Sequence, residues 1–282
     1  MTSPVVECVA NVSEGRQAAV IERLAAACRG LLLDTHSDRD HNRSVFTLLG
    51  PAGALLDAVR ALAVEAVGSL DLRAHSGVHP RIGVLDVVPF VSLRGWPVSD
   101  GEPGVAVATR NAFAAWAGTE LALPCFLYGG TDGPSLPDVR RHGWQTVAPS
   151  YGPPLPHPTA GAAAVGARPL LVAYNLWLEG SDLEFARQLA ASLRGPAVRA
   201  LGMAVGEGVQ VSCNLIDPLQ VGPAAAFDAV ASRTGVERAE LVGLLPARVL
   251  DAIPSRRWPE LGLDRSRTIE ARLEQAGLDG GS

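Results

Sequence analysis

The order of the apolar segments is the feature that most constrains the fold of this chain. A short apolar segment at residues 5–10 is typical of a strand, and residues 17–28 have apolar side chains at the i, i+3/i+4 spacing of a helix. Two further strands are expected at 31–33 and 45–49, followed by a strongly helical segment at 53–70. Strand, helix, strand, strand and helix in this order predict a layered α/β unit.

The second half of the chain restarts this pattern. Its expected elements are strands at 170–174 and 209–213 and helices at 182–194 and 223–234. Three strands are expected to end at an asparagine before a turn and a helix: Asn11, Asn175 and Asn214. Asparagine is a good turn residue, so each one alone carries little weight. The recurrence nevertheless indicates two similarly built halves.

A stretch rich in proline and glycine, residues 129–169, lies between the two halves. So much of both residues argues against a continuous helix or strand there. Loops of this length are usually linkers or binding segments. A helix at 103–121 and a strand at 125–128 are expected to precede it.

Composition excludes several classes of protein. The chain has 282 residues, 48% of them hydrophobic and only 19% charged, which is typical of a folded globular protein. The net charge of −5 argues against non-specific nucleic-acid binding, which needs a basic surface. All 24 basic residues are arginine, so the chain has no Schiff-base lysine and no phosphate-binding Gly-Lys-Ser/Thr loop.

The four cysteines are far apart and lack metal-binding or disulfide-framework spacing. We expect them to be buried apolar side chains in a reducing compartment, and we expect no metal. The first ten residues lack the basic start and apolar stretch of a secretory signal, and no 18-residue apolar run is present. These features predict a cytoplasmic protein without a membrane partner.

The densest group of chemically active side chains lies at residues 73–83, where two histidines and two arginines occur on a glycine-flanked loop. Pro80 disfavours a helical conformation of His79 and therefore holds this imidazole on extended backbone. A histidine beside arginine can act as an acid–base group near an anionic substrate. The alternative is a surface loop with a structural histidine, which the spacing favours for His75 and leaves open for His79.

A second polar cluster, residues 34–44, contains three carboxylates, two histidines and two arginines between two expected strands. We interpret it as a solvated polar turn, with a substrate-facing loop as the second interpretation. A metal site is the weakest interpretation, because ligands this local cannot close a site alone. The chain also lacks the motifs of serine hydrolases, zinc proteases and dinucleotide-binding enzymes.

Six segments together resemble the glutamate formiminotransferase family. The first is 6–16 (VECVANVSEGR), and the most distinctive is 77–90 (GVHPRIGVLDVVPF). The others are 42–45 (NRSV), 166–168 (GAR), 210–215 (QVSCNL) and 240–246 (ELVGLLP). They follow one another in unbroken order along nearly the whole chain, which makes the resemblance highly specific.

The resemblance implies an α/β (α+β layered) fold of two subdomains, which we assign to residues 1–169 and 170–282, packed around a folate-binding cleft in a homodimer. It implies formimino transfer between N-formimino-L-glutamate and tetrahydrofolate, the co-substrate, in histidine breakdown. The catalytic histidine of the family falls on His79.

The resemblance also implies the binding residues. The folate-binding segment falls on Gly152, Pro153, Pro154, Leu155, Pro156, His157, Pro158, Thr159, Ala160 and Gly161. We further expect substrate contacts from Asn11, His36, Arg43 and Arg81. His36 stands where animal members have a carboxylate. Two alternatives therefore stay open: a folate-dependent formyl or formimino transferase with a different amine substrate, and a folate-binding protein with little catalysis.

Overall fold

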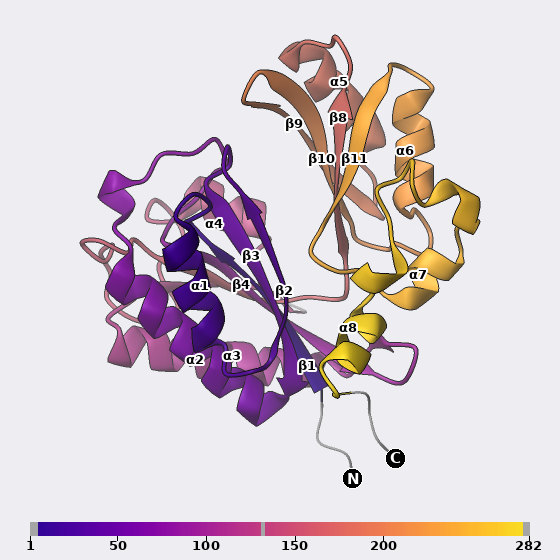
Figure 1. Cartoon of the computed structure of the whole chain (residues 1–282). Helices are drawn as coiled ribbons and strands as arrows, with labels where there is room; N and C mark the ends of the chain where they lie inside the picture. Colours follow the sequence, from indigo (N-terminus) through magenta and orange to yellow (C-terminus); the bar gives the residue numbers. More distant parts are fainter. Residues whose placement is uncertain (1–4, 131–132, 279–282) are drawn as a thin grey trace. The chain divides into compact units, whose positions relative to one another are not determined.

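The computed structural model describes residues 5–130 and 133–278, so both chain ends and residues 131–132 of the proline- and glycine-rich stretch lie outside the described residues. The chain divides into two compact units (Figure 1). Unit 1 comprises Met1–Arg94 and Asp100–Pro169, and unit 2 comprises Gly95–Ser99 and Leu170–Ser282.

Unit 1 is built on one mixed sheet. Its first elements are β1 (Val5–Val12), α1 (Ala18–Ala27), β2 (Leu32–Asp38), β3 (Arg43–Pro51), α2 (Ala52–Ser69) and β4 (Leu85–Arg94). These four strands lie in the order β2-β3-β1-β4, each antiparallel to its neighbours. The chain continues through β5 (Ser99–Asp100), α3 (Pro103–Glu120), β6 (Cys125–Gly129), α4 (Leu136–His142) and β7 (Ala163–Ala167). Strands β7 and β6 extend the sheet in parallel beyond β4.

Unit 2 repeats the first part of this arrangement. Its elements are β8 (Val172–Leu178), α5 (Leu183–Leu193), β9 (Val198–Val205), β10 (Gly208–Leu215), α6 (Pro223–Ala231) and β11 (Val236–Val242), followed by α7 (Ala247–Asp251) and α8 (Ile269–Gln275). The sheet order β11-β8-β10-β9 corresponds to β4-β1-β3-β2 of unit 1. Both units therefore contain the same split βαβ topology, and the predicted fold of two similarly built α/β halves is confirmed.

The core of unit 1 lies between the sheet and the helices α1, α2 and α3. Helix α2 buries residues at helical spacing, namely Leu55, Ala58, Val59, Leu62, Ala63 and Ala66. Strand β1 contributes alternate residues to this core: Val6, Cys8, Ala10 and Val12. Because side chains alternate along a strand, Val9 and Asn11 lie on the opposite face of the sheet. This alternation places Asn11 away from the core helices.

The proline- and glycine-rich stretch contains more regular structure than its composition predicts. Helix α4 begins at a capping box in which Ser135 and Asp138 bond each other's backbone N–H groups. Strand β7 is composed of alanine, valine and glycine, and a Cβ at Gly166 would run into the Tyr128 ring. The expectation of a continuous loop was therefore wrong, because capping side chains and small residues overcame the local preference for turns.

Two other expectations are corrected. The polar segment 34–44, expected to be a turn, is a strand through Asp38, and β3 begins at Arg43, so only 39–42 form the turn. Pairing with β3 extends this polar segment as an edge strand. The expected strand end at Asn175 was also wrong, since this residue lies within β8 and pairs with both Ser212 and Glu240.

All four cysteines are buried and free of disulfides, as the sequence predicts. Among the described residues, no helix combines the length and apolar character needed to cross a membrane.

Gly161 is expected to be intolerant of a side chain. Its φ is +71°, and an added Cβ would lie 2.8 Å from the Leu72 side chain and run into the Ile82 carbonyl. We expect Gly161→Ala to reduce the free energy of unfolding by about 1–3 kcal/mol in urea titrations. Gly68→Ala is the control, because a Cβ there meets nothing within 4 Å. In this α2 position alanine should be neutral or stabilising by up to about 1 kcal/mol. Equal stability of the Gly161 variant and wild type would contradict the expected strain.

Candidate functional site

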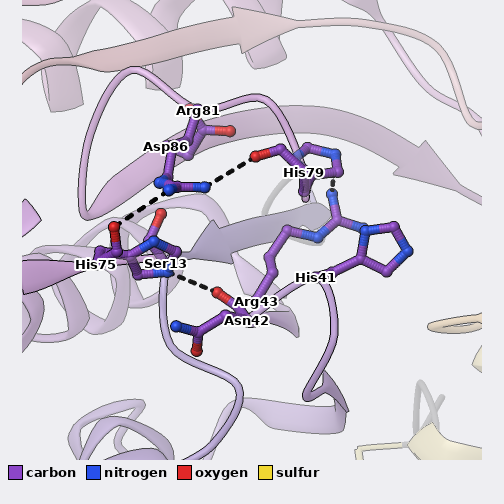
Figure 2. A pocket seen from close by; sticks show the side chains of 8 residues that line it. All are labelled: Ser13, His41, Asn42, Arg43, His75, His79, Arg81 and Asp86. Atoms are coloured by element: carbon purple, nitrogen blue, oxygen red, sulfur yellow. Dashed lines mark hydrogen bonds between the residues drawn. The ribbon is translucent and has the colours of Figure 1, made fainter. Parts of the chain in front are cut away.

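The turn between β2 and β3, the end of β1 and the loop before β4 bring polar side chains together in unit 1. One small pocket is lined by Ser13, His41, Asn42, Arg43, His75, His79, Arg81 and Asp86 (Figure 2). The space between these side chains is too narrow for a water molecule. The two polar clusters that the sequence shows separately therefore form a single site.

Arg43 connects two of the predicted site residues. Its Nη1 donates to Asn11 Oδ1 at 2.9 Å. The same atom lies 2.8 Å from His79 Nε2 (Figure 2). An arginine has only donors, so His79 Nε2 is the acceptor of this bond. The rings of His41 and His79 lie edge to face, with centroids 5.9 Å apart. The structure thus brings Asn11, Arg43 and His79 into direct contact.

The surroundings of His79 favour its neutral form. Burial lowers the pKa of His79 to about 2, and the nearby charges of Arg43 and Arg140 act in the same direction. Burial also lowers the pKa of Arg43 to about 10, so this guanidinium remains charged at neutral pH. A neutral imidazole beside a charged guanidinium has the protonation state required of a base near an anionic substrate.

Strand register places these groups. Asn11 pairs with Val45 in the β1–β3 ladder, and Arg43 lies two residues from Val45 on the same face. His36 pairs with Val45 from the other side, in β2, so it shares this face. It does not line the pocket, although it belongs to the described residues.

Hydrogen bonds of the Asn42 side chain stabilise the turn that precedes Arg43. Its side-chain Oδ1 accepts from Gly15 N at 2.9 Å, and its Nδ2 donates to Ser76 O at 2.9 Å. His75 Nε2 lies 2.8 Å from the Asn42 carbonyl. Asn42 adopts φ 47°, and a Cβ at Gly15 would lie 2.6 Å from the Arg43 nitrogen. The bonds from Asn42 to Ser76 and His75 join the two clusters, and Gly15 attaches the loop after β1 to them.

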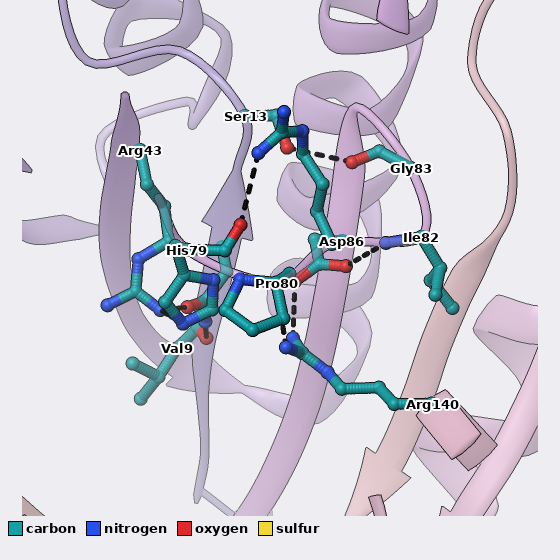
Figure 3. Close-up of polar contacts among 11 residues, drawn as sticks. Val9, Ser13, Arg43, His79, Pro80, Ile82, Gly83, Asp86 and Arg140 are labelled. Atoms are coloured by element: carbon teal, nitrogen blue, oxygen red, sulfur yellow. Dashed lines mark hydrogen bonds and ion pairs between the residues drawn. The ribbon is translucent and has the colours of Figure 1, made fainter. Parts of the chain in front are cut away.

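Asp86 holds the loop that carries His79 (Figure 3). Its buried carboxylate accepts from Ile82 N at 2.7 Å and from Arg140 Nη2 at 2.5 Å. Arg140 Nη1 donates to the Pro80 carbonyl at 2.6 Å. Burial raises the pKa of Asp86, and the charge of Arg140 opposes this shift. The ion pair therefore anchors both ends of the turn that follows His79.

Sequence reasoning missed both members of this pair. Arg140 lies on α4, in the stretch that was expected to lack helix. The Ser135–Asp138 capping pattern was the available signal for that helix. Asp86 is a lone carboxylate in the apolar segment 84–90, a pattern that indicates a buried charge with a partner.

The guanidinium of Arg81 forms hydrogen bonds to backbone carbonyls of its own loop. Its Nη1 donates to the Gly77 carbonyl at 3.0 Å. It also donates from Nη1 to His79 O at 3.0 Å and from Nη2 to His75 O at 3.3 Å (Figure 2). These bonds fold the loop around the guanidinium. Arg81 lines the pocket, but three of its hydrogen bonds serve to shape the loop.

Residues 152–161, all of which the structure describes, do not line the His79 pocket. Their second half runs beside the same loop: Ala160 O accepts from Val84 N at 2.9 Å, and Gly161 pairs with Gly83. His157 Nδ1 accepts from Ala160 N at 2.9 Å and closes a tight turn. Pro154 lines another recess, together with 144–149. The segment therefore neighbours the His79 loop through its backbone.

Comparison with known proteins identifies the family. Residues 5–168 match the model of the formiminotransferase domain, N-terminal subdomain. The chain belongs to the formiminotransferase family. The family match includes His79, Arg43, Asp86 and Arg140 as well as the segment 152–161. Among the described residues of this family member, no group of three or more histidine, cysteine or acidic side chains could hold a metal ion.

Several curated members of the formiminotransferase family are similar over most of this chain. A glutamate formimidoyltransferase of Streptococcus pyogenes is 34% identical, over 87% of this chain and 90% of its own length. One of Thermoplasma acidophilum is 30% identical, over 96% and 98%. The formimidoyltransferase-cyclodeaminase of Sus scrofa is 32% identical, over 88% of this chain but 51% of its own length.

The neutral state of His79 should affect stability at acid pH. The unfolded chain takes up a proton near pH 6.5, whereas the folded His79 has a pKa of about 2, so stability should fall as pH decreases below 6.5. At pH 5 this contribution amounts to about 2 kcal/mol. We expect urea titrations of His79→Asn to lack this part of the pH dependence. Buried Glu7, whose pKa is raised to about 7, acts in the opposite direction but is common to both proteins. Parallel pH profiles would contradict the assignment.

Removing Arg140 should leave the carboxylate of Asp86 buried without its charged partner. We expect Arg140→Met to lower the free energy of unfolding by about 3–5 kcal/mol at neutral pH. The loss should shrink as pH falls, because protonated Asp86 needs no counter-charge. Arg141→Met is a matched control, since Arg141 is exposed and makes only a 3.6 Å pair with Asp138. That variant should remain within about 0.5 kcal/mol of wild type. Equal losses in the two variants would refute the anchoring role of Arg140.

Proposed function

We propose that the protein is a glutamate formimidoyltransferase, which moves a formimino group between N-formimino-L-glutamate and tetrahydrofolate. The observation that carries this proposal is the neutral, partly buried His79, whose Nε2 lies 2.8 Å from Nη1 of the charged Arg43. The relatives from Streptococcus pyogenes and Thermoplasma acidophilum are glutamate formimidoyltransferases, and their activity supports this reaction.

The chemistry requires one group that first accepts and then returns a proton. The folate amine attacks the amidine carbon, and its proton passes to His79 as the new carbon–nitrogen bond forms. The tetrahedral intermediate then breaks its bond to the glutamate nitrogen, which receives the proton from His79. The products are formimino-tetrahydrofolate and glutamate. One imidazole serves both steps, because its neutral and protonated forms are each used once.

Arginine side chains suit the carboxylates of the donor. Arg43 is charged and part of the pocket, and Asn11 accepts one of its hydrogen bonds. Arg81 and His36 are further proposed contacts, His36 from the same sheet face as Arg43. For the folate we propose residues 152–161, whose second half bonds the backbone of the His79 loop.

The wider assignments follow from the same reaction. We propose that unit 1 is the N-terminal and unit 2 the C-terminal formiminotransferase subdomain. We further propose a cytoplasmic homodimer that acts in histidine breakdown and one-carbon metabolism, uses no metal and binds neither nucleic acid nor membrane.

Two other functions remain to be separated by experiment. A folate-dependent transferase with a different formyl or formimino substrate would bind reduced folate but not turn over formiminoglutamate. A folate-binding protein with little catalysis would bind folate and turn over neither class of donor. Equilibrium binding of tetrahydrofolate, followed by assays with N-formimino-L-glutamate and with formyl donors, distinguishes the three.

His79 should be essential for turnover. We expect His79→Ala to reduce kcat by about 10²–10⁴-fold in a formiminoglutamate–tetrahydrofolate assay, the usual effect of removing a positioned acid–base group. Tetrahydrofolate binding, measured by calorimetry, should change much less. His142→Ala is the control, since this histidine lies at the end of α4 and does not line the pocket. A His79 variant with nearly normal turnover would remove this residue from the mechanism.

A further inference from the structure

Only one of the three guanidinium nitrogens of Arg43 forms hydrogen bonds to described residues. Its Nη1 bonds Asn11 and His79, whereas its Nε and Nη2 make no hydrogen bond to any residue that the structure describes. Arg43 as a whole is only partly buried. The Nε–Nη2 edge of a guanidinium fits a carboxylate through two parallel hydrogen bonds. Arg43 therefore combines a bond to the proposed base with a carboxylate-binding edge that has no hydrogen-bond partner among the described residues.

The contact with Arg43 must break before His79 can accept a proton at Nε2. Its Nε2 lone pair accepts the hydrogen bond from Arg43, and its ring also bonds the Pro80 backbone. The imidazole and the guanidinium line the same narrow pocket. A general base needs an open lone pair within reach of the proton it removes. Without a ligand, Arg43 therefore occupies the Nε2 lone pair of His79.

We propose that a substrate carboxylate binds the Nε–Nη2 edge of Arg43 and moves the guanidinium away from His79. The Nε2 lone pair of His79 is then available to accept a proton only when the donor is bound. This inference rests on the proposed function for the identity of the donor. Asn11 Oδ1 gives the guanidinium a point of attachment that does not depend on His79. Arg43 can therefore turn toward the carboxylate without leaving the site.

The charges around His79 support the same conclusion. Burial is the main cause of the lowered pKa of His79, and the charges of Arg43 from β3, Arg140 from α4 and His41 from the turn before β3 lower it further. Asp86 from β4 lies against Arg140, which satisfies its charge. A carboxylate bound to Arg43 adds a negative charge and cancels the nearest of these positive charges. The pKa of His79 should then rise, because the second of the causes that lower it is offset.

Nitrogen-15 NMR of histidine rings tests the coupling without any turnover. The full-length protein is labelled at histidine, and His79→Gln assigns the His79 signals. In the ligand-free protein we expect His79 to stay neutral down to about pH 4. With saturating N-acetyl-L-glutamate, which has both donor carboxylates but no transferable amidine, its titration should move up by about one pH unit or more. The diamide of N-acetyl-L-glutamate, which lacks both charges, should leave it unchanged.

Two variants sharpen the test. Arg43→Met should let His79 titrate higher than in wild type without any ligand, and should weaken N-acetyl-L-glutamate binding by about tenfold or more. Arg73→Met is the matched control, because Arg73 is an exposed arginine of the same loop, paired with Asp71. It should leave the His79 titration unchanged. If Arg43→Met does not fold, the ligand titration of wild type still decides.

The outcomes separate this inference from the proposed function. If N-acetyl-L-glutamate binds and the His79 signals do not respond, the coupling is refuted, while turnover of formiminoglutamate would preserve the proposed function. If this ligand fails to bind, the coupling is refuted as well. A carboxylate-dependent response of His79 supports the coupling, even in a protein that does not turn over formiminoglutamate.

Discussion

The carboxylate of Asp86 is almost completely buried, and the geometry of the site depends on how its charge is satisfied. Arg140 and the Ile82 N–H supply its partners, and the same Arg140 holds the Pro80 carbonyl. A buried ion pair adds little net stability compared with an apolar pair, but breaking it is costly. Here it fixes the backbone on both sides of Arg81, and thereby the position from which His79 meets Arg43.

The site is a cationic pocket made without lysine. Two arginines and three histidines line it, and Asp86 is its one acidic lining residue among those described. Arginine suits this environment, because its charge survives burial that would deprotonate an amine. When one guanidinium contacts both the base and an anionic substrate, substrate binding changes the protonation state of the base. In such an arrangement the positive charge that suppresses the base at rest is the same charge that recognises the donor.

The fold could be predicted from sequence where local patterns were strong. Helix α2 follows its apolar spacing, and both halves have the expected alternation of strands and helices. Prediction failed where long-range pairing overruled local preference. Residues 34–38 have the composition of a polar turn, but pairing with β3 makes them a strand. Similarly, β7 is a strand because it forms hydrogen bonds with β4 on one side and with β6 on the other. The composition of a segment does not predict which strand it will pair with, because the partner strand lies far away in the chain.

The sequence by itself determined the parts of the site that depend on neighbours in the chain. Pro80 sets the backbone of His79, and the six motifs establish the family and with it the proposed chemistry. Only the tertiary structure decided which side chains meet. Arg43 reaches His79 across 36 residues, and Arg140 reaches Asp86 across 54. These contacts require the register of β1 with β3 and the docking of α4, which are set by the burial of side chains from distant segments, so no local pattern can specify them.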